Sequence, residues 1–125
     1  MKILNSFFVF SLFFFGSCRR NDIGGDANLK LQIMHHNSPI NNSVAYVSFD
    51  AIEMPKDPET NYDLKVQGNA TNNFIEVNGL RAGQYYIYVV GFDSGINLPV
   101  RGGIPIEIKW KERKSFQEIL IPVVE

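Results

Sequence analysis

The chain has 125 residues, a length that suits one domain. Its 12 Lys and Arg against 13 Asp and Glu give a formal net charge of −1, without the basic excess that nucleic-acid-binding proteins use to neutralise phosphates. A single cysteine excludes an intramolecular disulfide, so a hydrophobic core must stabilise the fold.

The first 17 residues have the pattern of a secretory signal peptide. Lys2 provides a short basic start, and residues 3–15 form a Phe-rich apolar stretch broken by only three polar residues. This stretch is shorter than the roughly 20 apolar residues that a membrane-spanning helix needs. We therefore predict that residues 1–17 are removed on export.

Small residues directly precede the single cysteine. Phe15, Gly16, Ser17 and Cys18 resemble the bacterial lipobox, in which the thiol receives a diacylglycerol and the cleaved chain begins at the cysteine. The resemblance implies a palmitate-type lipoprotein attached at Cys18 to the cell envelope, with the outer membrane as the expected membrane. Two or three acyl chains give stable attachment, since each buried methylene contributes about 0.8 kcal/mol. The alternative is an ordinary cleaved signal followed by a chance cysteine.

Residues 18–28 are polar and contain glycine, which is typical of a flexible tether between lipid and domain. From Leu29 onward, short runs of alternating apolar and polar residues are separated by turn residues, which predicts β-strands. Seven strands are expected, over residues 29–34, 44–52, 64–67, 74–77, 85–92, 103–110 and 116–124. We therefore predict that residues 29–125 form one all-β domain, an antiparallel seven-stranded β-sandwich. Because proline cannot donate to a ladder, we expect the strands that contain Pro105 and Pro122 to lie at sheet edges or to carry bulges there.

The stretch NGLRAGQYYIYV, residues 78–89, resembles a known superfamily motif. It is similar to the GL-x-PG-x-Y-x-V-x-V stretch of prealbumin-like domains, which include carboxypeptidase regulatory-like domains and Cna B-type repeats, with Ala82 in place of the usual proline. The resemblance implies an Ig-like, seven-stranded sandwich, and period-two alternation turns one set of side chains inward. The inward-facing residues are expected to be Leu80, Tyr85, Ile87 and Val89.

The overall layout is also similar to small lipoproteins of Bacteroidota that carry one such domain. Cna B-type repeats can form an internal Lys–Asn isopeptide bond, and the resemblance would assign Lys30 and Glu76 as the lysine and the acid. Residues 116–125 contain no asparagine, so we predict no isopeptide bond.

The second face of the 85–92 strand is aromatic. Tyr86, Tyr88 and Phe92 alternate with the inward-facing residues, and Tyr46 lies on the second predicted strand. Exposed aromatic side chains can stack on sugars or dock a protein, so these four residues are our candidate partner or glycan face. The alternative is cross-strand packing with Tyr46, or cover by the long loop at residues 53–63.

Oxygen-bearing side chains recur at every second position in that loop. They are Asp57, Glu59, Asn61 and Asp63. A calcium loop has similar spacing, but Tyr62 stands where an EF-hand needs glycine, and Gly68 stands where it needs a bidentate glutamate. A solvated loop is therefore the first interpretation and calcium the second, and no cofactor is predicted.

The only histidines, His35 and His36, are adjacent. Neighbouring residues on a strand point to opposite faces, so the pair is not expected to converge on one metal without a bulge. We expect them to be ordinary polar residues at a strand end, with metal binding as the second interpretation. Nor does the sequence contain a nucleophile in a strained elbow or a marked pair of carboxylates. We therefore expect a non-catalytic envelope module that binds a protein or glycan or serves as a structural accessory. A small-ligand carrier is the alternative, and an enzyme is the third hypothesis.

Overall fold

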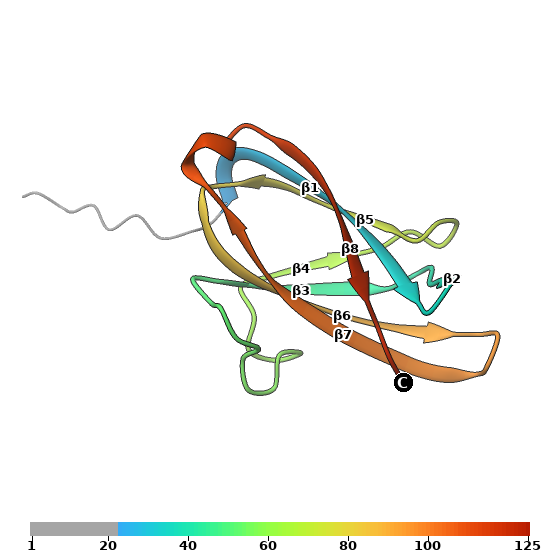
Figure 1. Ribbon diagram of the computed structural model, residues 1–125. Helices are drawn as coiled ribbons and strands as arrows, with labels where there is room; N and C mark the ends of the chain where they lie inside the picture. Colours follow the sequence, from blue (N-terminus) through green and yellow to red (C-terminus); the bar gives the residue numbers. More distant parts are fainter. Residues whose placement is uncertain (1–22) are drawn as a thin grey trace, which may run out of the picture.

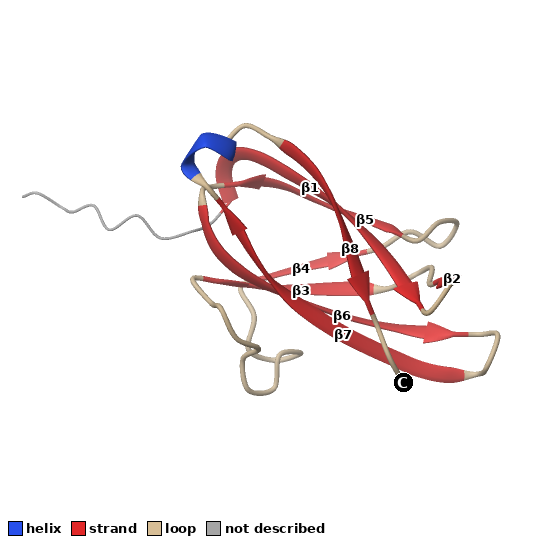
Figure 2. Cartoon of the chain, in the orientation of Figure 1, coloured by secondary structure: helices blue, strands red, loops and turns tan. Residues whose placement is uncertain are grey.

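Two β-sheets packed face to face make up the part of the chain that the computed structural model describes, residues 23–125 (Figure 1). Strands dominate these residues, and a short 3-10 helix, Trp110–Glu112, is the one helical element among them (Figure 2). The predicted signal peptide and the lipidation of Cys18 lie outside the described residues.

The first sheet is built around β1. This strand pairs antiparallel with β5 along one edge and parallel with β8 along the other, and β2 adds a two-residue extension at its end. The bounds are β1 Ile23–His35, β2 Ser38–Pro39, β5 Phe74–Leu80 and β8 Phe116–Pro122. The second sheet is antiparallel throughout, in the order β4-β3-β6-β7. Its strands are β3 Val44–Phe49, β4 Leu64–Gln67, β6 Gly83–Asp93 and β7 Leu98–Ile108.

The all-β sandwich and all seven predicted strands are confirmed, with two corrections. The structure has eight strands rather than seven, because Ser38–Pro39 forms the short β2 within an expected connection. The sandwich is also not purely antiparallel, since β1 and β8 run in the same direction. Alternation of apolar and polar residues has the same period in both kinds of pairing, so the sequence pattern does not distinguish them.

The predicted tether is partly wrong, because β1 begins at Ile23 and Ala27 is fully buried. The glycines in this segment indicated flexibility, but Gly25 instead allows β1 to pack closely against the backbone of β5. A Cβ on Gly25 would lie 2.4 Å from the carbonyl oxygen of Leu80. The register of β1 against β5 shifts on both sides of Ala27, so this part of the strand is irregular but paired.

The predicted core residues are confirmed, since Leu80, Tyr85, Ile87 and Val89 all have no exposed surface. Tyr85 also donates its hydroxyl hydrogen to the carbonyl of Arg81, at 2.7 Å, across the turn that leads into β6. Such a bond from a tyrosine to backbone just upstream is the tyrosine corner found in Greek-key sandwiches. The stretch from residue 78 to 93 therefore contains both core and turn.

The expectation that the two proline-bearing strands lie at sheet edges is confirmed. β7 pairs along its length with β6, and β8 pairs with β1. Beyond β8 the chain passes over Gly102, where a Cβ would meet the carbonyl oxygen of Pro122 at 2.3 Å. Two backbone hydrogen bonds then join Arg101 to Val124, and the amide of Val123 donates to Met34. The last residues thus connect the two sheets.

Candidate functional site

The outer face of the second sheet is the predicted aromatic face, and the structure covers much of it. Tyr46 and Tyr88 are only 8% and 7% exposed, because the segment between β3 and β4 folds over them. The Tyr62 ring of that segment lies 5.1 Å from the Tyr46 ring, centroid to centroid. Our expectation of exposed tyrosines is therefore wrong for these two, and cover by the loop is the alternative that holds.

The other two aromatic residues have different surroundings. Tyr86 is half-buried and lies against Gly103, where an added Cβ would come within 2.8 Å of its ring. Phe92 is 50% exposed near the end of β6. The four candidate residues thus share one face of the sheet, but only its margin is open.

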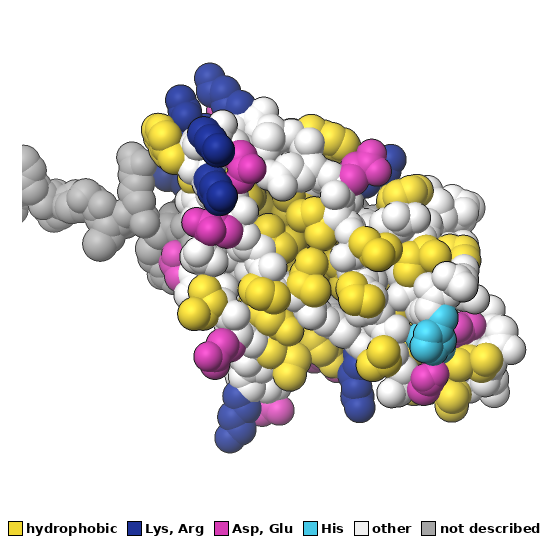
Figure 3. All heavy atoms as spheres, viewed as in Figure 1, with side chains coloured by type: hydrophobic (Ala, Val, Ile, Leu, Met, Phe, Trp, Pro, Cys, Tyr) yellow, Lys and Arg dark blue, Asp and Glu magenta, His cyan; other side chains and the backbone are white. Residues whose placement is uncertain are grey.

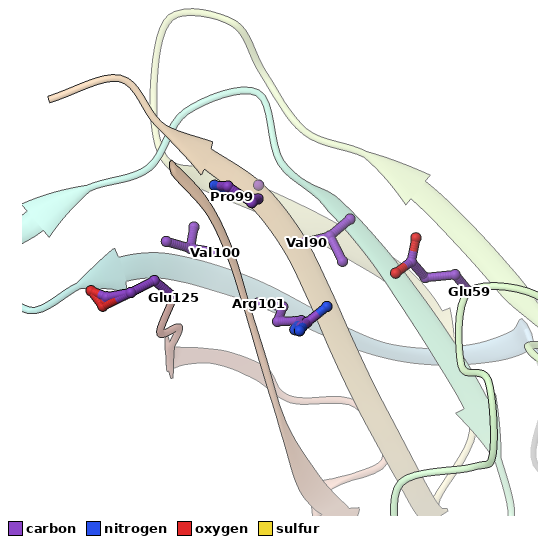
Figure 4. Close-up of a pocket in the computed structure, with 7 residues that line it drawn as sticks. Glu59, Val90, Pro99, Val100, Arg101 and Glu125 are labelled. Atoms are coloured by element: carbon purple, nitrogen blue, oxygen red, sulfur yellow. The ribbon is translucent and has the colours of Figure 1, made fainter. Parts of the chain in front are cut away.

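A groove lies between the covering loop and β7. Two adjoining depressions, of about 430 and 270 Å³, share Glu59 and Arg101 in their walls. Tyr88 lines the larger one, and Val90 lines the smaller. Figure 4 shows Glu59 extending from its loop toward Val90 and Arg101. A carboxylate, a guanidinium and a phenol therefore surround one open space.

Tyr88 contributes a protonated hydroxyl to this groove. Burial raises the pKa of Tyr88 above its ordinary value, the negative charge of Glu59 raises it further, and Arg101 partly opposes both effects. The hydroxyl therefore remains a neutral donor and acceptor at neutral pH. With Arg101 as a donor and Glu59 as an acceptor, the groove can hydrogen-bond a polar ligand such as a saccharide.

Two of the four calcium candidates make side-chain hydrogen bonds that hold the loop. Asp63 accepts a hydrogen bond from the backbone amide of Phe49, at 2.8 Å, and Asn61 donates to the carbonyl of Lys56. Glu59 lines the groove. In the described range, residues 23–125, the carboxylates of Asp57, Glu59 and Asp63 do not gather within metal-binding distance of one another.

A second polar cluster lies where β1, β6 and the end of the chain meet. His35 is 3% exposed, its Nδ1 lies 2.8 Å from Oδ2 of Asp93, and its Nε2 lies 3.0 Å from Oε2 of Glu125. The other Asp93 oxygen accepts the amide hydrogen of Gly95, at 2.9 Å. The cluster thus links the first sheet, through β1, to the second sheet, through β6.

The charges in this cluster stabilise one another. The hydrogen bond to Asp93 raises the pKa of His35, burial opposes this, and Glu125 raises the pKa further. Correspondingly, the hydrogen bond from His35 lowers the pKa of Asp93, burial opposes this, and the Gly95 amide lowers it further. The two carboxylates therefore favour the protonated form of the imidazole in the absence of other ligands.

The two histidines come together, which corrects the expectation that they would diverge. His36 lies just past the end of β1 with a positive φ of 57°, so the alternation of a strand no longer applies. As a result the two rings lie 4.4 Å apart, centroid to centroid. One ligand atom each from His35, His36 and Glu125 lie within 4.8 Å of one another.

The opposite end of the domain, where β1 begins, is basic and aromatic. The 3-10 helix and its flanks, residues 109–114, contain four basic residues and one acid, a local charge of +3. Trp110 is 68% exposed, and the Arg113 guanidinium lies 4.2 Å from the centre of its ring. The amide of Asn28 in β1 donates to the carbonyl of Ser115, which holds this turn beside the start of β1. Figure 3 shows Lys and Arg gathered here, and a histidine with acidic neighbours near the other end.

Comparison of the chain with protein-family models, with curated proteins and with solved structures found no match. Within residues 23–125, no helix is long and apolar enough to cross a membrane.

Sequence reasoning missed three features of these sites. The partners of His35 are 58 and 90 residues away, so no local pattern joins Asp93 and Glu125 to it. Likewise, no sequence pattern indicated that Arg101 would line the groove. The run KWKERK at residues 109–114 was visible, but its proximity to the start of β1 was not.

Proposed function

We propose that this chain is a lipid-anchored, non-catalytic module of the bacterial cell envelope that binds a protein or glycan or serves as a structural accessory. The anchor is an acylated Cys18, and the outer membrane is the expected location. The protein's partners in this proposal are the membrane and one envelope component. Nucleic acid is not among them.

One observation supports this proposal most strongly: the basic, Trp-bearing end lies where the anchor would hold the domain. β1 begins at Ile23, five residues after Cys18. Five residues of chain span at most about 18 Å, so this end would remain close to the lipid headgroups. Lys and Arg are attracted to anionic headgroups, and Trp prefers the membrane–water interface. An anchor at Cys18 and a basic surface around Trp110 therefore favour the same orientation.

For the fold family, we propose that the sandwich is of the prealbumin-like type. The buried positions of Leu80, Tyr85, Ile87 and Val89 agree with the motif that the resemblance is based on. Lys30 alternates with buried Leu29 and Leu31, and its ammonium lies over the ring of Phe74 rather than in the core.

For the ligand, we propose that the groove at Tyr88, Arg101 and Glu59 is the binding face, with a saccharide as the alternative to a protein partner. Its mixture of hydrogen-bond donors and acceptors suits hydroxyl-rich ligands. The groove lies away from the basic end, because Glu125, which lines its smaller depression, contacts His35 at the other end of β1. A ligand there would remain accessible from the aqueous phase.

The experiment is fractionation of the native cell combined with co-purification. After a wash near 1 M salt, which screens the attraction of the basic end to anionic lipid, the intact protein is expected in the membrane fraction, together with whatever its groove binds. A Cys18→Ser variant is expected to be lost from that fraction. An Arg101→Gln variant should remain membrane-bound but lose the co-purifying component. Membrane association unchanged by Cys18→Ser would reject the anchor, and an unchanged partner with Arg101→Gln would reject the groove.

A further inference from the structure

We propose that His35, His36 and Glu125 form a binding site for a divalent transition-metal ion, with Zn²⁺ as the cation that best fits. The donor set is two imidazole nitrogens and one carboxylate oxygen, which is typical of zinc sites with three protein ligands. The site lies at the far end of β1 from the basic end, because the extended segment from Asn28, which bonds the basic turn, to His35 spans about 23 Å. It is therefore independent of the proposed anchor.

His35 is the fixed ligand. An ionised carboxylate can only accept hydrogen bonds, so the contact of 2.8 Å to Asp93 places the proton on Nδ1. Nε2 then points toward Glu125 and can offer its lone pair to a cation once its own proton is lost. Asp93 is itself held by the amide of Gly95. A carboxylate that orients the far nitrogen of a ligating histidine is a regular feature of protein zinc sites.

The other two ligands are close enough to complete the site. The three ligand atoms lie within 4.8 Å of one another, and tetrahedral ligands at 2.0–2.2 Å from zinc are about 3.4 Å apart. The separations between the ligand atoms must therefore shorten by up to about 1.4 Å. His36 and Glu125 are both exposed, so their side chains can make this adjustment while His35 stays in place. A water molecule would supply the fourth ligand, as in other open zinc sites.

A bound ion would join two parts of the chain directly and reach a third through the hydrogen bond from His35 to Asp93. His35 and His36 belong to the end of β1 and its turn, Asp93 ends β6, and Glu125 follows the segment that already bonds both sheets through Val123 and Val124. Zinc would replace the proton between His35 and Glu125, so binding releases protons and strengthens with rising pH. The inferred site thus links the end of β1 to the end of the chain, and the hydrogen bond from His35 to Asp93 connects it to the second sheet.

The test uses the full chain purified in detergent without an affinity tag, stripped with EDTA and titrated with ZnCl2 by calorimetry. We expect one Zn²⁺ per chain and, with Co²⁺ as a spectroscopic substitute, visible absorption bands of a four-coordinate site. His36→Gln is the decisive variant, because His36 is exposed and its loss should leave the fold intact. It should weaken zinc binding at least as much as loss of an orienting carboxylate, which costs about 10–100-fold.

Glu118→Gln is the matched control for Glu125→Gln, since both remove one exposed carboxylate but only Glu125 is near the histidines. Zinc affinity should fall with Glu125→Gln and stay constant with Glu118→Gln. A plain ion pair between His35 and Glu125 does not need His36. Zinc binding that His36→Gln leaves unchanged, or no saturable binding at all, overturns the proposal.

Discussion

The basic end of the domain should bind anionic membranes even without its lipid, and two lysines should carry much of this binding. Lys109 and Lys111 flank the exposed Trp110 on the 3-10 helix, and both side chains are exposed. Each Lys or Arg near an anionic membrane contributes about 1 kcal/mol. Changing both to glutamine should therefore cost about 2 kcal/mol, a roughly 30-fold weaker partition onto vesicles, since 1.4 kcal/mol is about tenfold.

Trp110 is the only tryptophan of the chain, so its fluorescence reports directly on contact with lipid. The assay titrates the non-lipidated chain, from residue 19 onward, with vesicles of neutral phospholipid containing about one-third anionic lipid. A blue shift of the emission is expected on binding. It should vanish near 1 M salt, where the screening length falls to about 3 Å.

The matched control is the double variant Lys56→Gln and Lys65→Gln, which makes the same change in net charge. Both of these lysines are exposed, on the covering loop and on β4, away from the 3-10 helix. If the control weakens vesicle binding as much as the Lys109 and Lys111 pair, net charge rather than this surface is responsible. In that case the proposed orientation is wrong.

Three further predictions concern the fold and the histidine cluster. Tyr85→Phe removes the hydrogen bond to the turn and should cost about 1 kcal/mol, or roughly 4–8 °C in Tm, while Tyr86→Phe on the outer face should change Tm little; equal shifts would refute the tyrosine corner. Gly102→Val should unfold or strongly destabilise the domain in urea titrations, because its side chain would collide with the backbone of Pro122, and a midpoint unchanged from wild type would contradict this packing. In EDTA, the raised pKa of His35 contributes stability that is complete below its ordinary value of 6.5 and is lost as pH rises through the raised pKa. The lowered pKa of Asp93 contributes stability that is present above its ordinary value of 3.8 and is lost as pH falls through the lowered pKa. Tm should therefore be highest at mildly acidic pH, where both groups are charged, and His35→Gln should remove the decline on the alkaline side; a decline that persists in this variant would point to other groups.

Much of the fold could be predicted because alternation of apolar and polar residues is a local property. It located seven strands, the inward face of β6 and the edge strands with their prolines. The direction of β8 relative to β1 could not be predicted, because side-chain alternation is the same in parallel and antiparallel pairs. The start of β1 was missed for a different reason: Gly24 and Gly25 are typical of a flexible tether, yet Gly25 is required by the backbone of Leu80.

The candidate sites depended on contacts that are distant in sequence. The aromatic face was correctly assigned to the outer side of β6, but its exposure depended on the path of the 53–63 loop, which no periodicity specifies. The histidine pair was judged by strand geometry, and the positive φ of His36 removed that premise. Positive φ is uncommon in residues other than glycine, and no sequence pattern here indicated it at His36, so the convergence could be found only from the structure.

The anchor at Cys18 is the central claim, and the intact mass of the protein extracted from its own membrane tests it most directly. We expect the mass of a chain that begins at Cys18 and carries a diacylglycerol on its thiol, with or without a further acyl chain on the new amino group. A chain that begins elsewhere, or one that begins at Cys18 with an unmodified thiol, would contradict it.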